Sequence, residues 1–373
     1  MSFSKSALLI FGCILNSACV FLQPDAALDE TLVESEPPPS VVVVIEPQAP
    51  IDLRQLESMP ADASIVGSLQ WISAYHEDTL PDIARQHGLG FDEMIQANPG
   101  VDPWLPGEGT RVLLPTRMIL PSQREGLVLH VASRRLFHFD EQGVLQDTFA
   151  IGVGREGWAT PTGQAKVRAK AKDPVWFVPA SIRAEHAEAG DPLPRRVGPG
   201  PDNPLGGYAI ALDMPGYLIH GTNKPYGVGM RVSHGCVRLY PEDIESLFPR
   251  VPVGAPVTIL NEPISVAEVD GQLYLEAHPP FEGDQTWQGH WEEVQGRLLQ
   301  DPRVASREID WEKARAIIEA AMGIPLPISV NSLDVQAALE QVNVVRHTRP
   351  VPEELVDELP AEAPLLAEPQ AAQ

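Results

Sequence analysis

The chain has 373 residues, enough for two or three domains of ordinary size. Hydrophobic residues make up 43% of it, sufficient for packed cores, and 27 basic against 51 acidic residues give a net charge of −24. So acidic a chain is unsuited to nucleic acid, whose phosphates require a basic surface. The excess acid lies in the flanks: residues 126–262 hold 14 basic and 14 acidic residues, so we interpret the acidic flanks as solvated surface.

Residues 1–19 have the pattern of a secretory signal peptide. A positively charged head, residues 1–5, precedes an apolar core, residues 7–15, and a short run of small residues. The apolar core is too short for a membrane-spanning helix, so we expect cleavage and export. Cys19, at the end of this segment, resembles the acylated cysteine of bacterial lipoproteins, although Asn16 departs from that pattern. Plain cleavage and lipid anchoring at Cys19 are both open.

The next segments predict a linker and a small module. Residues 20–66 are rich in Pro, Glu, Val and Ala, which is typical of an extended linker. Residues 67–117 predict a strand, two short helices and a second strand. Asp78 or Thr79 would cap the first helix, and Asn98-Pro99-Gly100 would end the second.

This small module resembles the LysM family. Asp78-Thr79-Leu80, Asn98-Pro99 and Leu114-Pro115 stand where that family has them, while Glu77 replaces its usual Gly. The resemblance implies a βααβ fold that binds glycans containing N-acetylglucosamine, such as peptidoglycan. A spacer domain that binds no ligand is the alternative.

Residues 126–262 predict a mainly β domain. Leu127, Leu129 and Val131 alternate with His130 in the period of a half-buried strand, and further short apolar runs continue to the final strand, Pro256 to Leu260. One helix is predicted from Pro241 to Phe248. Many short strands and one helix indicate a β-sandwich or barrel-like sheet.

The sequence of the C-terminal third predicts some secondary structure but no function. Residues 263–345 hold a hairpin around Asp270-Gly271 and a helix from Trp311 to Met322, and no motif there assigns a role to this accessory region. Residues 346–373 are rich in Pro, Glu and Ala and predict a disordered tail.

Chemically, the most informative residue is a single cysteine. Of the three cysteines, Cys13 and Cys19 belong to the signal segment, so the mature chain retains only Cys236. In an oxidising compartment, a lone cysteine is either an inert buried side chain or a reactive thiol.

The neighbours of Cys236 favour the reactive thiol. A thiol attacks carbonyl groups as thiolate, and an imidazole can take its proton. His220 ends one predicted strand and His234 lies two residues before Cys236. Gly235 would let the backbone approach a substrate and help form an oxyanion site. Arg238, two residues after Cys236 in an extended chain, would share its side and could hold a carboxylate.

Two other interpretations of this cluster are open. His220, His234 and Cys236 could supply three ligands to a catalytic zinc ion, although no paired ligand spacing such as Cys-x-x-Cys is present. Alternatively, the cysteine is buried and inert beside two structural histidines.

Two short segments resemble the YkuD-type catalytic domain of the L,D-transpeptidase family. They are Ile219-His220-Gly221-Thr222 and, after a spacer, Ser233-His234-Gly235-Cys236. Within that family the chain most resembles the periplasmic γ-proteobacterial group of ErfK, YbiS, YcfS and YnhG. The resemblance implies that Cys236 is the nucleophile and His220 the proton donor and acceptor, oriented by the carbonyl of Gly221. It implies an oxyanion region at His234 and Gly235. We expect substrate contacts from the residues Arg238, Ser233 and Asn223.

The resemblance also implies a reaction. The thiol would attack a peptidoglycan tetrapeptide stem after meso-diaminopimelate, release D-Ala, and pass the acyl group to an amine. A second stem would give a 3→3 cross-link, the Lys of a Braun-type lipoprotein would give a wall anchor, and water would make the enzyme an L,D-carboxypeptidase. No cofactor or metal is expected. A non-catalytic LysM wall-binding protein and a cysteine endopeptidase are the competing classes.

Overall fold

The computed structural model describes residues 49–55, 60, 62–280 and 291–349. The predicted signal peptide, most of the predicted linker and the chain beyond 349 lie outside these ranges. Over the described ranges, no helix has the length and apolar character that a membrane crossing requires.

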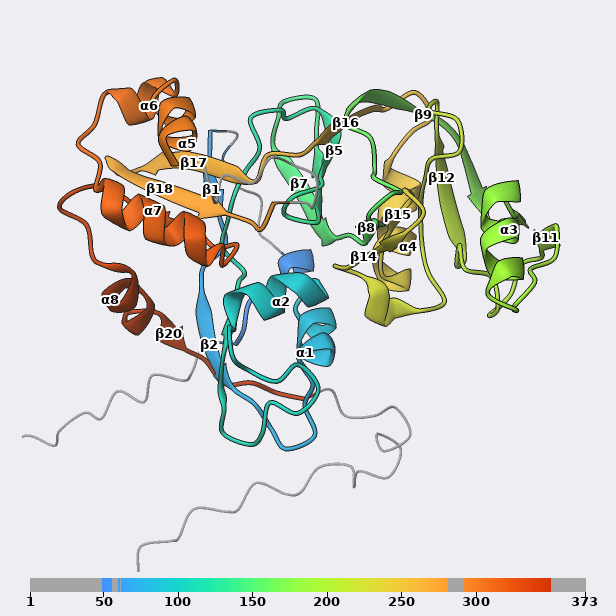
Figure 1. The fold of residues 1–373 in the computed structure, drawn as a ribbon, viewed down its shortest axis with the longest axis horizontal. Coiled ribbons are helices and arrows are strands. Elements are labelled where there is room, and N and C mark those ends of the chain that lie inside the picture. Colours follow the sequence, from blue (N-terminus) through green and yellow to red (C-terminus); the bar gives the residue numbers. More distant parts are fainter. Residues whose placement is uncertain (1–48, 56–59, 61, 281–290, 350–373) are drawn as a thin grey trace, which may run out of the picture. The chain divides into compact units, whose positions relative to one another are not determined.

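An eight-stranded sheet forms the centre of residues 126–262 (Figure 1). Its strands run in the order β15-β13-β12-β9-β16-β5-β6-β7, and they are antiparallel except for the parallel pairs β13–β15 and β16–β5. The protein is mainly β, as predicted. The strand bounds are β5 Gly126–His130, β6 Arg135–Phe139, β7 Leu145–Ala150, β9 Gly163–Lys172, β12 Tyr208–Leu212, β13 Leu218–His220, β15 Val237–Arg238 and β16 Pro256–Leu260.

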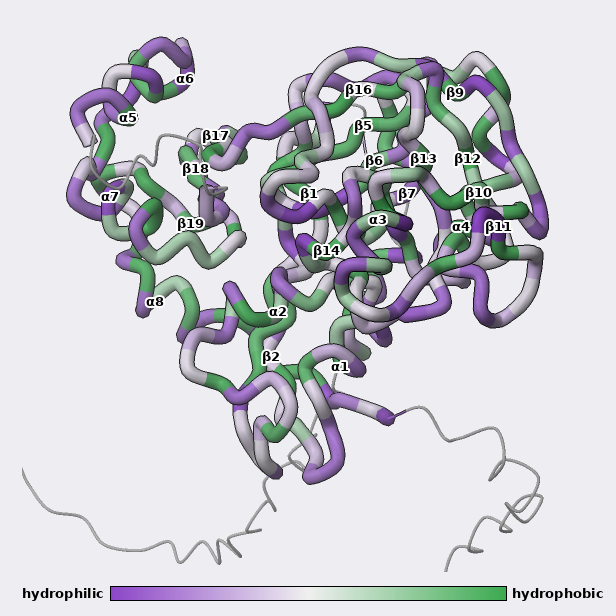
Figure 2. The backbone as a smooth tube through the Cα atoms, turned by 45° about the vertical axis from the view of Figure 1, so that its right-hand side comes forward, coloured by the Kyte–Doolittle hydropathy of each residue, from purple (hydrophilic) through white to green (hydrophobic). Residues whose placement is uncertain are grey.

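The sheet is apolar on both faces around β5. Leu127 and Leu129 pack into one core beneath helix α4 (Pro241–Arg250), while Val128 packs into a second core on the opposite face. Figure 2 shows apolar stretches along β5, β12 and β16. The prediction that this strand is buried on one face only is therefore wrong, because even the side chain of His130 is only 4% exposed. A strand covered on both sides has a continuous apolar run.

The second core joins this sheet to the small βααβ module. The module consists of β2 (Gln70–Ser73), α1 (Leu80–Gln86), α2 (Phe91–Ala97) and β3 (Arg111–Leu114). Thr79 caps α1 by accepting a hydrogen bond from the Asp82 amide at 3.2 Å. The Asn98 side chain donates to the carbonyls of Met94 and Leu113, which ties the end of α2 to β3.

Shorter elements flank these two parts. A pair of strands, β1 (Ile65–Val66) and β4 (Met118–Ile119), lies on either side of the module in sequence, and a short helix, η1 (Leu53–Gln55), precedes both. Residues 173–207 form an insertion between β9 and β12, with strands β10 (Trp176–Phe177) and β11 (Arg196–Val197) and helix α3 (Ala180–Glu188), which lies beside β11 in Figure 1. No pattern in the sequence predicted α3.

The C-terminal region has its own core. The predicted hairpin is β17 (Ile264–Val269) and β18 (Gln272–Ala277), which pairs with β19 (Leu326–Pro327). The predicted helix is α7 (Trp311–Ala320). Its C-cap residue is Ala321, which adopts a left-handed φ of 46°. The remaining helices are α5 (Trp291–Leu298), α6 (Pro302–Ala305) and α8 (Val335–Glu340).

The chain after α8 returns to the βααβ module. Strand β20 (Asn343–Val344) pairs in parallel with β2, so the module's sheet has three strands. His347 is buried, and its Nε2 lies 3.1 Å from the Asp78 carboxylate. The packed chain therefore continues beyond residue 346, where the sequence predicts the disordered tail to begin.

Two ion pairs with buried carboxylates join separate elements: one joins the central sheet to the module, and the other joins η1 to α4. Arg135 of β6 is 1% exposed and donates to Glu93 of α2 at 3.0 Å and to the carbonyl of Gly88 at 3.2 Å. Arg54 donates to the buried carboxylate of Asp243 on α4 at 2.7 Å. Burial raises the pKa of Asp243 to about 6, although Arg54 opposes this shift. Removing one member of such a pair leaves an uncompensated buried charge.

We predict that Arg135→Leu lowers the free energy of unfolding by about 3–5 kcal/mol, because Glu93 would stay buried without its cation. Arg315→Leu is the matched control, since Arg315 pairs with Glu319 in the open, where both side chains are more than half exposed; its cost should be below about 1 kcal/mol. Urea unfolding followed by tryptophan fluorescence measures both. Equal, small costs would contradict the assignment of Arg135 as a buried anchor.

Candidate active site

Parallel pairing of β13 with β15 brings His220 and Cys236 together. Ile219 pairs with Val237 and His220 with Arg238, and both Ile219 and Val237 point into the core. Side chains alternate along a strand, so His220 and Arg238 share the opposite face. Cys236 directly precedes Val237 and, by the same alternation, lies on that face diagonally across from His220.

The imidazole of His220 is buried and fixed in orientation. Its Nδ1 lies 2.6 Å from the carbonyl oxygen of Gly221, the contact predicted for that residue. A carbonyl only accepts hydrogen bonds, so Nδ1 carries the proton and Nε2 has the free lone pair. Burial, followed by the nearby charge of Arg238, lowers the pKa of His220 to about 3. The ring is therefore neutral at physiological pH and able to accept a proton.

Cys236 is half-buried and holds a free thiol. Its Sγ lies 3.5 Å from the carbonyl oxygen of Gly216. Burial raises the pKa of the thiol, and the backbone at Leu218 and the charge of Arg238 partly offset this. A thiol with a raised pKa needs a base close by to form thiolate near neutral pH.

The loop before Cys236 is shaped by Gly235 and Ser233. Gly235 has φ +97°, and a Cβ there would lie 2.9 Å from Cε1 of Tyr217, so only glycine fits. The Ser233 hydroxyl donates to the Cys236 carbonyl at 2.6 Å and accepts from the Gly235 amide at 3.1 Å. Thr160 donates to the Gly235 carbonyl from a neighbouring loop at 3.0 Å.

These contacts correct two expectations. Ser233 is 1% exposed and its hydroxyl bonds within the loop, so it shapes the loop and does not face a substrate. The Gly235 amide donates to Ser233 and is not directed at an oxyanion. The positive φ of Gly235 shapes the turn before Cys236, and its part in an oxyanion region stays a prediction.

His234 points to a group of residues that the sequence analysis missed. Its Nε2 lies 2.9 Å from a carboxylate oxygen of Glu185 on α3 and 3.1 Å from Nη2 of Arg155, which also bonds to Glu185. Trp158 meets the ring edge-on, with centroids 4.9 Å apart. The positive φ of Gly235 interrupts the strand alternation. The contacts of His234 are accordingly with Glu185, Arg155 and Trp158.

The remaining predicted residues differ in exposure. Arg238 is half-buried beside His220 and Cys236, its Nε is buried without a hydrogen-bond partner, and no carboxylate among the described residues pairs with it. Asn223 is exposed on the loop after His220. Among the described residues, no three His, Cys, Asp or Glu side chains gather as a metal site.

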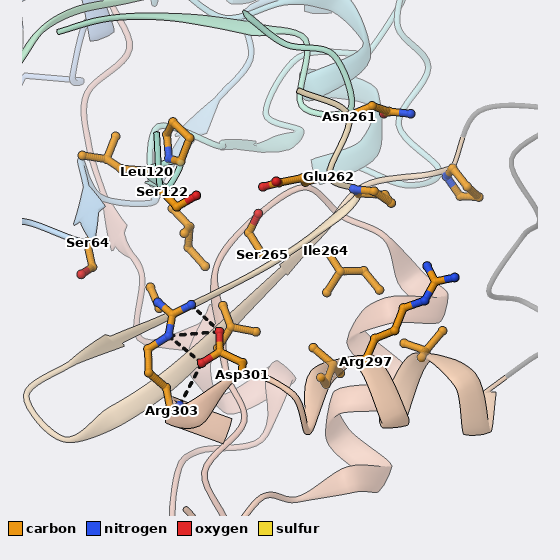
Figure 3. A pocket seen from close by; sticks show the side chains of 18 of the residues that line it. Ser64, Leu120, Ser122, Asn261, Glu262, Ile264, Ser265, Arg297, Asp301 and Arg303 are labelled. Atoms are coloured by element: carbon orange, nitrogen blue, oxygen red, sulfur yellow. Dashed lines mark hydrogen bonds and ion pairs between the residues drawn. The ribbon is translucent and has the colours of Figure 1, made fainter. Parts of the chain in front are cut away.

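A cavity of about 640 Å³ lies elsewhere in the chain (Figure 3). Most of its described lining residues come from 119–124, 261–267, α5 and α6, and they include neither Cys236 nor His220. In Figure 3, Arg303 is joined to Asp301 by hydrogen bonds at one side of it. This cavity is lined jointly by the C-terminal region and by segments before it, and its described lining does not include the cysteine site.

Comparison with known proteins gives consistent matches to one family. A family model described as the L,D-transpeptidase catalytic domain, YkuD, matches residues 124–259. Probable L,D-transpeptidase ErfK/SrfK of Escherichia coli (strain K12) is 36% identical over 280 residues, covering 73% of this chain and 90% of that protein. Probable L,D-transpeptidase YbiS of the same organism is 42% identical over 229 residues, covering 60% of this chain and 74% of YbiS.

The chain therefore belongs to the L,D-transpeptidase family and is a transferase. The match to the relatives extends well beyond the catalytic domain, since ErfK/SrfK aligns over 90% of its length. The resemblance stated from the sequence motifs is confirmed at the level of the family.

We predict that Gly235→Ala lowers turnover about a hundredfold, because the new Cβ would displace the loop that holds Cys236 by a large fraction of an ångström. Gly254→Ala is the matched control: its φ is +92°, but no atom lies within 4 Å of the added Cβ. Steady-state turnover is measured for both variants beside their urea unfolding curves. Equal turnover in the two variants would contradict the steric argument.

A second prediction concerns the thiol. Alkylation of Cys236 by iodoacetamide should still be rising with pH where an ordinary thiol of pKa about 8.5 has levelled off, because burial disfavours the thiolate. Arg238→Met removes a cation that favours the thiolate, so its rate profile should move to higher pH. Lys224→Met, an exposed cation on the preceding loop, is the control. The idea fails if the Arg238→Met and wild-type profiles superimpose.

Proposed function

We propose that this protein is a peptidoglycan L,D-transpeptidase that works through a Cys236 thioester. The observation that carries the proposal is the pairing of β13 with β15, which sets a neutral, oriented His220 diagonally from a free thiol. The curated relatives are named L,D-transpeptidases, which fits this chemistry.

In the first step, the proton of Cys236 passes to Nε2 of His220, and the sulfur attacks the carbonyl carbon that links meso-diaminopimelate to D-Ala in a tetrapeptide stem. A C–S bond forms, the C–N bond breaks, and the proton on His220 passes to the leaving amine of D-Ala. The Cys236 amide is the oxyanion donor in this proposal, because the Gly235 amide is bonded to Ser233. The half-buried guanidinium of Arg238 holds a substrate carboxylate.

In the second step, an amine attacks the thioester, its proton passes through His220, and the Cys236 thiol is restored. A second stem as acceptor gives a 3→3 cross-link, and the lysine of a Braun-type lipoprotein gives a wall anchor. Water gives carboxypeptidase activity. We propose an amine acceptor and a periplasmic location, which the sequence of residues 1–19 supports, with the βααβ module acting as a LysM domain on the glycan.

The test is product mass analysis of the mature protein with a disaccharide-tetrapeptide, with and without a lipoprotein C-terminal peptide that ends in Lys. We expect a product whose mass equals donor plus acceptor minus one alanine. Cys236→Ala should reduce it to background, and His220→Ala should reduce the rate about 10²–10⁴-fold, as for loss of a general base. A trimmed donor alone would make the enzyme a carboxypeptidase. No turnover with intact wall binding would identify a non-catalytic wall protein.

A further inference from the structure

Glu185, Arg155 and His234 form a cluster built from three separate segments. Glu185 lies on α3 within the 173–207 insertion, Arg155 follows β8 (Val153–Gly154), and His234 follows β14 (Arg231–Ser233). The Arg155 amide donates to the Ser233 carbonyl at 3.0 Å, and Ser233 in turn bonds to Cys236. Arg155 is thereby attached to the loop that presents the thiol.

Glu185 and Arg155 require opposite hydrogen-bonding roles of Nε2 of His234. Nε2 of His234 lies within hydrogen-bond distance of both the Glu185 carboxylate and Nη2 of Arg155. Arginine only donates and an ionised carboxylate only accepts, so Nε2 can bond to one of them and not to both. Arg155 first, and His234 second, hold the pKa of Glu185 below its usual range, so the carboxylate is ionised. Nε2 therefore carries a proton and donates it to Glu185.

Helix α3 has little apolar packing of its own. Among its nine residues, only Ile182 is buried. The contacts of Glu185 with Arg155 and His234 connect this helix to the loop before Cys236. Without Glu185, Nε2 would face only the guanidinium and would have to accept a hydrogen bond from it. The ring proton would then move to Nδ1.

We propose that Glu185 is a positioning residue for the L,D-transpeptidase reaction: its carboxylate fixes the tautomer and orientation of His234 and, with Arg155, holds α3 to the loop that presents Cys236. The proposal rests on the proposed role of Cys236. It assigns the 173–207 insertion a part in the reaction although Glu185 lies 49 residues from His234 in the sequence.

The test compares Glu185→Ala with Glu188→Ala, which makes the same change at an exposed position at the end of the same helix. Long-range ¹H–¹⁵N correlation of the His234 ring, at a pH where the ring is neutral, reads the tautomer directly. We expect the Nε2–H form in the wild type and in Glu188→Ala, and the Nδ1–H form in Glu185→Ala. We also expect kcat to fall about tenfold to a hundredfold in Glu185→Ala, with KM changed less than about threefold.

Arg155→Met removes the other partner of His234 and leaves the Glu185 carboxylate in place. It keeps the proposal testable if Glu185→Ala loosens the packing of α3. With the guanidinium gone and the carboxylate present, the ring should keep the Nε2–H form. Glu185→Asp keeps the charge and should recover part of kcat.

Two results would overturn the proposal. One is a Glu185→Ala protein that has the tautomer and kcat of Glu188→Ala. The other is a rise in KM alone, which would make Glu185 a substrate contact. If the wild type shows no turnover, the proposed function fails, while the ring spectra still decide whether Glu185 positions His234.

Discussion

The parallel register between β13 and β15 is the constraint on which the site depends. It places a core residue of each strand opposite the other and so directs His220, Arg238 and Cys236 to the same outer face. A slip of one residue would turn this set inward and expose Ile219 or Val237, at a cost that the apolar core opposes. The same packing that stabilises the sheet therefore positions the reacting groups.

Each reacting group is held by contacts that use the local backbone. The Gly221 carbonyl fixes the His220 tautomer, and the Ser233 hydroxyl closes the turn that Gly235 permits. Burial lowers the pKa of the His220 imidazole and raises the pKa of the Cys236 thiol. The charge of Arg238 favours both the neutral ring and the thiolate. The site is thus a neutral acid–base pair beside Arg238, which pairs with no carboxylate in the part of the chain that the structure describes. In this state the proton stays on the thiol, while the lone pair of His220 Nε2 is free to accept it during attack on a carbonyl group.

Local signals in the sequence predicted much of the fold. Thr79 as a helix cap, Asp270-Gly271 as a hairpin turn and Pro241 as a helix start all act within a few residues, and the structure has each of them. The burial of β5 on both faces was missed because the covering module comes from a different part of the chain. Strand β20 was missed because its partner β2 is distant in sequence.

The residues of the site likewise divide into those that a local sequence motif predicts and those that only the fold brings together. The motif around Cys236 predicted the contact between His220 and the Gly221 carbonyl, and the structure has it. The motif did not reveal that the Ser233 hydroxyl is bonded within the loop, because a buried hydroxyl and a substrate contact look alike in sequence. Glu185 and Arg155 gave no signal, because they lie 49 and 79 residues from His234 in the sequence and meet it only in the folded chain.

The most direct test of the account is intact-protein mass spectrometry after brief mixing with a disaccharide-tetrapeptide and no added lipoprotein peptide, with acid quenching before a second stem accepts the acyl group, followed by peptide mapping. The account predicts a covalent adduct with the mass of the donor minus alanine, attached at Cys236 and absent in Cys236→Ala. An adduct on another residue, or release of D-Ala with no adduct on Cys236 at any quench time, would contradict it.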